Sequence, residues 1–323
     1  MYARIAGVGS YLPSKRVTNF DLEQVLDTTD TWITERTGIK ARHVAAPHEG
    51  VSLLAKVAAQ RALDAARMMP NDVDLIILST SIPENFFPSS ACLLQSLLEI
   101  TRPIPTFDLS AACAGFIYAL ITAEQFIKAG TYKTVLVVGS EIASRSVDWS
   151  HRNTAILFGD GAGAVVLTKS DEPGMITSKL YSQSQYKDLL YFKNPQAEAS
   201  PECKTLERTY LTMCGNEVFR IAVKSLGDIV EEIVGLSGIA KKDIQWLVPH
   251  QANIRIIEAI ASRLDFSMEK VILTIAEQGN TSSASIPLAL DAGIRDGRIQ
   301  RGDHLLIEGF GGGFVWGASL IRY

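Results

Sequence analysis

The chain has few cysteines and histidines, and their spacing excludes the common metal sites and disulfide frameworks. Its 323 residues include four cysteines and five histidines. The cysteines stand at positions 92, 113, 203 and 214, and no pair of them has the spacing of a zinc knuckle. The histidines do not cluster with them. We therefore expect reduced thiols, no metal site and a cytoplasmic protein.

Long apolar runs and blocks of like charge are also lacking. The longest apolar run, residues 111–121, is too short to cross a bilayer, and the N-terminal residues show no pattern of a secretory signal. The formal net charge is −4, and the basic residues are scattered along the chain. We expect no membrane and no nucleic-acid partner, and an acidic partner would have to meet a local basic patch.

Short apolar runs alternate with helical patterns. The candidate strands, which are apolar enough to be buried on both faces, are residues 74–79, 134–139, 245–249 and 304–308. Between them, apolar side chains recur at helical spacing, as in residues 54–65. This alternation predicts an α/β fold.

The second part of the chain repeats the first in the same order. The similar pairs are residues 71–77 with 242–248, residues 137–140 with 306–309, and residues 158–167 with 310–320. Three pairs in one order favour two similar halves, which we place at 1–170 and 171–323. The polar stretch 169–207, which shows little periodicity, would connect them.

Two glycine-rich runs, at 159–163 and 309–313, are followed by strand residues, whereas a dinucleotide-binding loop needs a helix there. We interpret both runs as tight turns. Glycine N–H groups in the second run could approach a ligand closely and donate to an oxyanion.

Cys113 is the candidate nucleophile. It stands in residues 108–116 (DLSAACAGF), where a strand end and small residues lead into an apolar helix. A thiol at a helix N-terminus faces unsatisfied N–H groups that favour the thiolate, and the small neighbours leave room for a substrate. Taken alone, Cys113 would more often be a buried core cysteine.

Two further residues favour the interpretation of Cys113 as a nucleophile over that of a core cysteine. His250 lies in residues 249–253 (PHQAN), directly after an apolar strand, where open α/β sheets place their sites. Asn280 lies in residues 279–283 (GNTSS), a loop that leads into a helical run. Papain-like proteases also carry Cys, His and Asn in this order, but the sequence around their cysteine differs. A hydrolase remains a distant alternative.

These motifs, together with residues 308–317 (EGFGGGFVWG), resemble the 3-oxoacyl-[acyl-carrier-protein] synthase III family from Ile5 to Tyr323. Elongating condensing enzymes carry Cys-His-His instead, and degradative thiolases have a second active-site cysteine. The resemblance implies a homodimer with a thiolase-like α/β fold, internally duplicated in five layers, α-β-α-β-α. It also implies a decarboxylating Claisen condensation of a short acyl-CoA primer, which we expect to be acetyl-CoA, with malonyl-acyl carrier protein.

The resemblance further implies a role for each candidate. Cys113 would take the acyl group as a thioester, and the N–H groups of Cys113 and Gly312 would hold the tetrahedral oxyanion. His250 and Asn280 would donate to the thioester oxygen of the malonyl group as it decarboxylates. Donors aimed at the enolate oxygen suffice for this step, so no strong base is needed. Acyl-CoA is a substrate here, and we expect no cofactor.

Binding residues follow from the same resemblance. Coenzyme A would contact Trp32, Arg36, Arg152, Gly215, Asn216, Phe219, Ala252 and Asn253. The acyl pocket would be shaped by Ile142, Phe158, Leu211 and a Phe87 contributed by the second subunit. An indole and a guanidinium could hold the adenine between them. The carrier protein would meet Arg220 and Arg255.

Residues 85–89 and 181–203 depart from the commonest pattern of the family, which bears on primer selection and dimer contacts. The nearest rivals are a relative that transfers acyl groups in secondary metabolism and a type III polyketide synthase, which accepts malonyl-CoA. A requirement for the carrier protein would separate the latter. A non-catalytic subunit that binds carrier protein is a third possibility, and the intact set of three site residues speaks against it.

Overall fold

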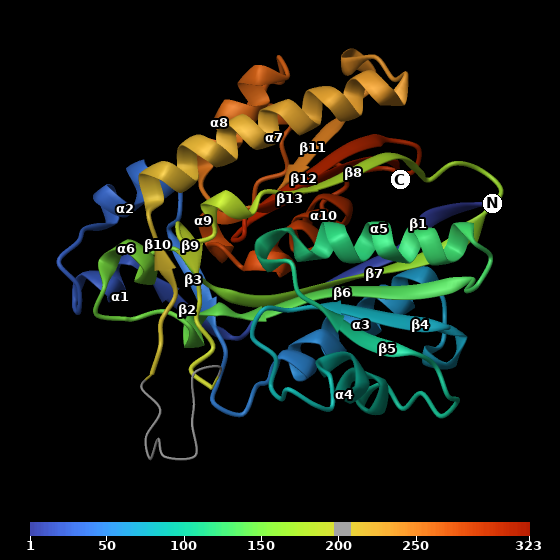
Figure 1. The fold of residues 1–323 in the computed structure, drawn as a ribbon, viewed down its shortest axis with the longest axis horizontal. Helices are drawn as coiled ribbons and strands as arrows, with labels where there is room; N and C mark the ends of the chain where they lie inside the picture. The colour runs from blue at the N-terminus through green and yellow to red at the C-terminus, as the bar shows by residue number, and fades with distance from the viewer. Residues whose placement is uncertain (197–207) are drawn as a thin grey trace.

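The computed structural model describes residues 1–196 and 208–323, and its two main sheets share one strand order (Figure 1). The first sheet runs β1 (Tyr2–Tyr11), β7 (Asp160–Ser170), β6 (Thr134–Ile142), β4 (Leu75–Ser79), β5 (Thr106–Leu109). Read from the corresponding edge, the second runs β8 (Met175–Ser182), β13 (Val315–Arg322), β12 (His304–Gly311), β11 (Trp246–Pro249). Two small sheets pair β2 (Lys15–Thr18) with β3 (Ala41–Val44) and β9 (Leu190–Tyr191) with β10 (Thr212–Met213).

Strand directions repeat as well. In each main sheet the first two pairs are antiparallel and the third is parallel. The position of β5 is taken in the second sheet by a parallel bridge between Leu247 and Val271. The chain is therefore an internal duplication, as expected, while the division at residue 170 stays a prediction.

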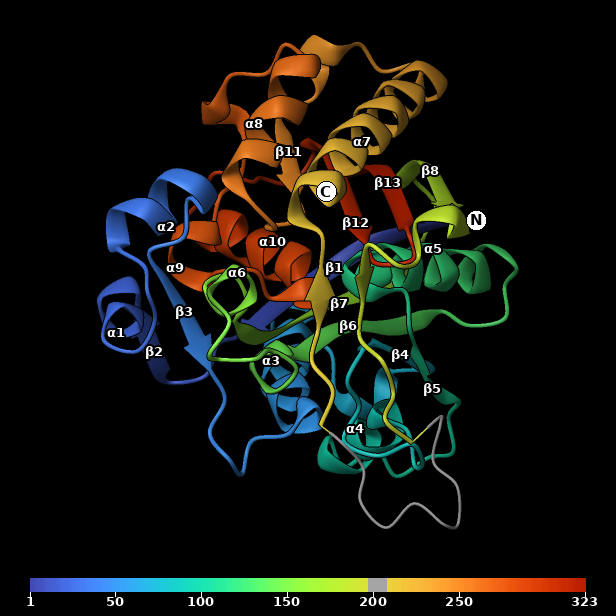
Figure 2. The same cartoon turned by 60° about the vertical axis from the view of Figure 1, so that its left-hand side comes forward.

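Helices form three layers around the two sheets (Figures 1 and 2). The helices are α1 (Asn19–Glu23), α2 (Asp30–Thr37), α3 (Val51–Ala66), α4 (Ser90–Leu97), α5 (Gly115–Lys128), α6 (Arg152–Ala155), α7 (Gly215–Ser237), α8 (Ile254–Arg263), α9 (Ile275–Gln278) and α10 (Ser285–Arg295). α3 and α4 cover the first sheet, α7 and α8 cover the second, and α5 and α10 contact strands of both. The five-layered thiolase-like arrangement is confirmed.

The helices of the central layer, α5 and α10, are apolar around most of their circumference, as burial between two sheets requires. Phe116, Leu120 and Ile127 of α5 are fully buried, in one cluster with Val137 of the first sheet and Ile307 of the second. Each such side chain stabilises the fold by about 1.5–3 kcal/mol. One shared core therefore fixes the start of α5 relative to the ends of strands in the other half.

Two expectations are wrong, one about the connection between the halves and one about the first glycine-rich run. Residues 175–182 of the supposed connection form β8, the edge strand of the second sheet. In the first glycine-rich run, Gly161 and Gly163 lie inside β7 and Gly159 directly precedes that strand, whereas the second run does turn, after Gly311. The strand glycines make room for α10, since a Cβ at Gly163 would lie 2.6 Å from the Pro287 Cβ.

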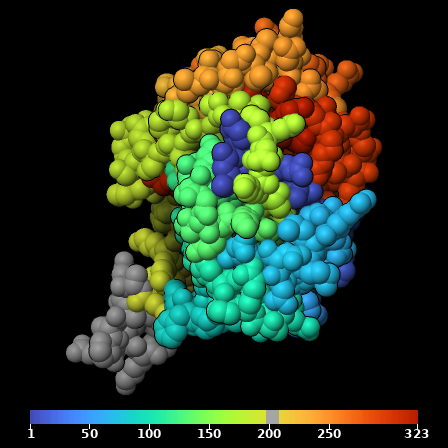
Figure 3. Space-filling model, turned by 90° about the vertical axis from the view of Figure 1, so that its right-hand side faces the viewer, coloured from blue at the N-terminus to red at the C-terminus, as the bar shows by residue number. Residues whose placement is uncertain are grey.

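The two halves also meet at the edge of the molecule where the chain begins. Figure 3 shows the N-terminal residues, in dark blue, beside C-terminal residues, in red. There Arg301 donates hydrogen bonds to the carbonyl oxygens of Ile5 and Ala6, at 2.6 and 2.7 Å. None of the described helices has the length and apolar character needed to cross a membrane.

Candidate active site

Cys113, His250 and Asn280 line a single cavity of about 870 Å³. Cys113 lies in the 3₁₀ turn Ala112–Ala114, which leads into α5, and His250 follows directly on β11. Asn280 precedes the 3₁₀ turn Ser282–Ala284, which leads into α10. The structure thus brings together three residues that the sequence placed in separate loops of the two halves.

His250 is held as a neutral hydrogen-bond donor. Its side chain is buried, and burial lowers the pKa of the imidazole to about 4, so the ring is uncharged at neutral pH. Nδ1 lies 2.6 Å from the Ser285 Oγ, which also accepts the Gln251 N–H at 3.3 Å. We assign the Ser285 hydroxyl as the donor in this hydrogen bond and Nδ1 as the acceptor. The imidazole proton is then on Nε2.

The amide of Asn280 is oriented by its neighbours. Its Oδ1 accepts the Ser282 N–H at 2.9 Å, so the Nδ2 hydrogens remain as donors. The backbone is fixed on both sides, because Asn280 N–H donates to the Leu157 oxygen and Gly159 N–H donates to the Asn280 oxygen. The preceding Gly279 has φ +65°, a conformation that favours glycine. This loop presents a preorganised amide donor.

Burial governs the thiol of Cys113. It raises the pKa of Cys113 to about 11, and the nearby Glu141 carboxyl adds to the rise, while the Ser282 hydroxyl opposes it. The expectation that the helix start makes Cys113 a ready thiolate is therefore wrong, because desolvation outweighs the helix terminus. A proton acceptor is needed to release the nucleophile.

The second glycine-rich run passes close to the backbone of Cys113. A Cβ at Gly311 would lie 2.6 Å from the Cys113 nitrogen, so only glycine lets the two backbones approach so closely. The next residue, Gly312, lines the cavity. The predicted oxyanion donors, the N–H groups of Cys113 and Gly312, therefore come from backbone segments that lie close together at this cavity.

Most of the predicted coenzyme A residues line this same cavity: Trp32, Arg36, Gly215, Asn216, Phe219, Ala252 and Asn253. Arg152 is not among the lining residues, but its guanidinium carbon lies 4.9 Å from the Trp32 ring centroid, and that of Arg36 lies at 4.7 Å. Asn253 links α8 to α2 by donating to the Arg36 carbonyl oxygen at 3.0 Å. An aromatic ring and two cations thus stand together at the cavity.

Comparison with known proteins decides the family. Residues 107–184 match 3-oxoacyl-[acyl-carrier-protein (ACP)] synthase III, and residues 236–323 match the C-terminal part of that family. A beta-ketoacyl-[acyl-carrier-protein] synthase III from Methylococcus capsulatus is 55% identical, over 100% of this chain and 99% of the relative. The chain belongs to the 3-oxoacyl-[acyl-carrier-protein] synthase III family. It is an acyltransferase, a condensing enzyme that initiates fatty-acid synthesis, as the sequence predicted.

Two solved structures, a synthase III and a priming beta-ketosynthase, agree with this fold. The enzyme from Aquifex aeolicus is 44% identical, with a TM-score of 0.92 over 99% of this chain and 100% of that one. The priming beta-ketosynthase of the R1128 polyketide pathway is 35% identical, with a TM-score of 0.95 over 99% of this chain and 96% of that one. The thiolase-like architecture is shared by both.

The predicted acyl pocket of this synthase III chain is only partly assembled. Phe158 and Leu211 line the cavity, but Ile142 is buried in the core between α3, α4 and the first sheet. Phe87 is 88% exposed and lies outside the cavity. The placement of Ile142 was wrong, because the cavity is lined by its neighbours Glu141 and Ala143 instead. Of the two predicted carrier-protein residues, Arg255 lines the cavity, whereas Arg220 is exposed outside it.

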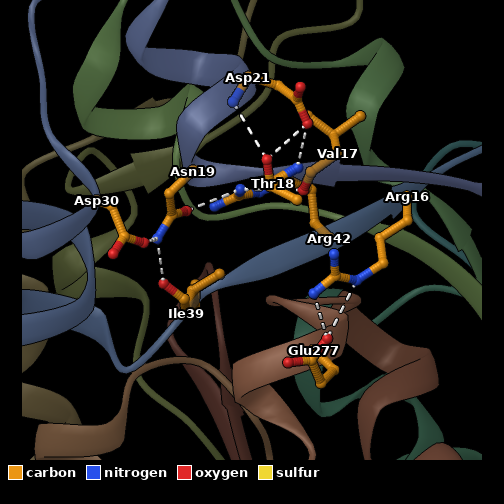
Figure 4. Close-up of polar contacts among 9 residues, drawn as sticks. All are labelled: Arg16, Val17, Thr18, Asn19, Asp21, Asp30, Ile39, Arg42 and Glu277. Atoms are coloured by element: carbon orange, nitrogen blue, oxygen red, sulfur yellow. Dashed lines mark hydrogen bonds and ion pairs between the residues drawn. The ribbon is translucent and has the colours of Figure 1, made fainter.

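One buried network that positions the site was missed (Figure 4). Arg42 is fully buried and donates to the Asn19 Oδ1 at 3.0 Å and to the Ile156 carbonyl oxygen at 2.6 Å. Asn19 donates in turn to Asp30, the first residue of α2. The network ties the helix that carries Trp32 to a wall of the cavity. The sequence offered little signal, because arginine is rarely buried.

Three side chains around the predicted set were also missed: Glu141, Ser282 and Ser285. A signal existed in the hydroxyl-rich run after Asn280, because buried hydroxyls need partners. The partner of that run, Glu141, comes from β6, far away in the sequence. Periodicity alone could not connect them.

Proposed function

We propose that this protein joins a short acyl group from acyl-CoA to malonyl-acyl carrier protein, through a Cys113 thioester. The observation that carries this proposal is the single cavity, lined by Cys113, His250 and Asn280 together with Trp32 and Arg36. A phosphate-bearing, adenine-containing thioester fits such a lining, because Trp32 offers a ring face and the guanidiniums offer bidentate charge. No cofactor is needed for this chemistry.

In the first half-reaction the Cys113 sulfur attacks the thioester carbonyl of acyl-CoA. The bond from sulfur to the acyl carbon forms, the bond from that carbon to the CoA sulfur breaks, and CoA leaves as a thiol. The N–H groups of Cys113 and Gly312 stabilise the oxyanion of the tetrahedral intermediate. Preorganised donors of this kind are worth about a hundredfold to a thousandfold in rate each.

In the second half-reaction the malonyl thioester loses carbon dioxide. The electron pair of the broken C–C bond becomes an enolate, whose oxygen takes hydrogen bonds from His250 Nε2 and the Asn280 amide. Both donors are neutral and fixed by Ser285 and by the Ser282 N–H. The enolate carbon then attacks the Cys113 thioester and frees the sulfur.

The partners follow the same proposal. Phe86 and Phe87 are adjacent exposed aromatics, 68% and 88% accessible, and a homodimer would cover them and bring Phe87 to the acyl pocket of the other subunit. Arg220 and Arg255, both exposed cations, would meet the acidic carrier protein. The protein would act in the cytoplasm.

Asn280→Ala tests the division of labour. The variant should still acquire an acyl group on Cys113, measured by intact mass after exposure to acetyl-CoA, while malonyl decarboxylation falls by about a hundredfold or more. Equal loss of both activities would place Asn280 in thiol activation, as in a cysteine hydrolase, and would contradict the proposal.

A second candidate differs in its primer and pathway. The similarity to the R1128 priming ketosynthase leaves open a priming role in polyketide synthesis. Incubation with acyl-CoAs of increasing length and branching, followed by mass analysis of Cys113, separates the two. Preference for acetyl-CoA supports fatty-acid initiation, and activity with malonyl-CoA in place of the carrier protein would indicate a type III polyketide synthase.

A further inference from the structure

Ser282 lies between the nucleophilic sulfur and a buried carboxyl group. Its Oγ is 3.3 Å from the Cys113 Sγ and 3.3 Å from the Glu141 Oε1. The distance to the sulfur is ordinary for a hydrogen bond to sulfur, whereas the distance to the carboxylate is long, as is common before a substrate tightens a site. A hydroxyl carries one proton and two lone pairs, so Ser282 can accept from the thiol and donate to the carboxylate at once. We propose that Ser282 and Glu141 form the relay that takes the proton from Cys113 when the thiol is acylated.

Glu141 is built to hold an extra proton. It is 1% exposed, and its oxygens receive bonds from Thr80 Oγ1, the Ser81 N–H and Ser283 Oγ, at 3.0–3.2 Å. None of the ion pairs among the described residues involves Glu141, so no cation fixes its charge. Burial raises the pKa of the carboxyl to about 7. The group can therefore accept a proton in the neutral range.

Cys113 and Glu141 oppose one another electrostatically. The negative carboxylate raises the pKa of the thiol, so the two groups resist ionising together. A single proton shared by the pair avoids two adjacent buried charges. Transfer through Ser282 creates the thiolate while the pocket keeps its net charge.

Other titratable groups facing Glu141 are poor substitutes. His250 lines the same cavity, but its Nδ1 is committed to Ser285, and the described hydrogen bonds include none between His250 and Cys113. On β7, both Asp160 oxygens accept from Ala45 and Ser144. On α10, Asp291 is bound to Ser10 and Arg295. The remaining titratable groups of the cavity lining are Arg36, Lys187, Tyr191 and Arg255, and none of them is hydrogen-bonded to Glu141.

The relay deepens the proposed function and rests on it for its role in acylation. The S–H proton passes to the Ser282 Oγ while the serine proton passes to Glu141 Oε1, and the sulfur electron pair forms the bond to the acyl carbon. The CoA sulfur takes the electron pair of the broken thioester bond and then the proton, by return through Ser282. Ser282 touches the reacting sulfur, whereas Glu141 acts through it and is a positioning residue.

The pH dependence of Cys113 alkylation by iodoacetamide tests the relay without any CoA chemistry. In the wild type the shared proton should produce a plateau starting near pH 7, the pKa of Glu141, in which the rate changes less than about twofold per pH unit. In Glu141→Gln the thiol must lose its proton to solvent, so the rate should rise about tenfold per pH unit through the same range. In Ser282→Ala the plateau rate should be lower than in the wild type, because the direct path from the thiol to Glu141 is lost. Ser282→Ala should fold, because Ala112 occupies the equivalent backbone position with φ 45°.

Ser283→Ala is the matched control. It removes a donor to Glu141 but none of the described hydrogen bonds of Cys113, so the plateau should persist and start at higher pH. A wild-type rate that rises tenfold per pH unit without a plateau overturns the relay, and so does a plateau that survives in Glu141→Gln. Acylation of wild-type Cys113 by acetyl-CoA is measured separately by mass. Its absence would contradict the proposed function and leave the alkylation profile to decide the relay.

Discussion

Ala112 and Ser282 adopt the same left-handed backbone conformation at equivalent positions of the two halves, with φ values of 45° and 51°. Each begins the 3₁₀ turn that leads into one of the central helices, α5 or α10. Residues other than glycine rarely adopt this conformation, and such strain gathers at functional sites. The second residue of the turn is Cys113 in the first half and Ser283 in the second half. Both residues lie close to Glu141.

The strained turn before the nucleophile predicts a sharp dependence on side-chain shape. Ala112→Val should lower the free energy of unfolding by about 1–3 kcal/mol, because a β-branched residue is disfavoured at positive φ. Ala112→Gly should stay within about 1 kcal/mol of the wild type, since glycine adopts this conformation freely. Urea unfolding of the three proteins checks this. Equal stability of the valine variant would mean that the turn is not strained.

The buried arginine network predicts a loss of both stability and coenzyme A binding. Arg42→Met should cost about 3 kcal/mol or more, because Asn19 Oδ1 and the carbonyl oxygens of Val17 and Ile156 lose a charged donor. The KM for acyl-CoA should also rise, since Asn19 holds α2 and its Trp32.

Arg16→Ala is the control for the same region. Its ion pair with Glu277 is exposed, with side-chain accessibilities of 45% and 59%, so the loss should be below about 1 kcal/mol (Figure 4). Thermal unfolding and the KM of both variants decide the matter. Similar losses in the two variants would show that burial of Arg42 does not govern the stability of this region.

The fold was predictable where the pattern was strongly periodic. Four apolar runs became β4, β6, β11 and β12, because strands buried on both faces need continuous apolar sequence. The edge strand β8 was not predicted, because a strand with one exposed side has a polar sequence with weak periodicity. The glycines of β7 were taken for a turn, although close packing of α10 is what requires them.

Site residues followed the same rule. Cys113, His250 and Asn280 were found because short motifs at strand and helix ends carry them, and the family resemblance joined the motifs. Glu141 and Arg42 were missed, because their importance comes from contacts with residues far away in the sequence. Ile142 was misplaced by a single residue along β6, where neighbouring side chains point to opposite faces. The thiol pKa was misjudged because desolvation depends on packing that no local pattern reveals.

The cations around Trp32 predict weaker binding of acyl-CoA when either is removed. Arg36→Ala and Arg152→Ala should each raise the KM for acyl-CoA by about tenfold or more, because a charge-assisted phosphate contact is worth about 1.5–3 kcal/mol. The turnover number should change little, since both guanidiniums lie at the α2 end of the site. Lys242→Ala, an exposed cation elsewhere, is the control. Unchanged CoA affinity in both variants would move the adenine site away from Trp32.

A second buried carboxyl predicts the pH dependence of stability. Glu308 on β12 is 1% exposed, and its Oε2 has no hydrogen-bond partner among the described residues. Burial raises its pKa to about 8 from an ordinary value of 4.5. The folded state thus keeps a proton that the unfolded state has lost. This contribution to stability is complete below pH 4.5 and disappears as the pH rises through 8.

Two other buried groups also make stability depend on pH. Their pKa values determine the pH range in which the contribution of Glu308 can be measured separately. Glu141 acts in the same direction, but only up to its pKa of about 7. His250, whose pKa is lowered to about 4, acts in the opposite direction between pH 4 and 6.5. Between pH 7 and 8, wild-type stability should therefore fall by about 1 kcal/mol because of Glu308, whose carboxyl begins to ionise in the folded state near pH 8. The free energy of unfolding of Glu308→Gln should change little between pH 7 and 8. That of the exposed control Glu172→Gln should fall as in the wild type. Denaturant unfolding at pH 7 and 8 measures each slope, and a Glu308→Gln slope equal to that of the wild type would show that the carboxyl is already ionised in the folded protein.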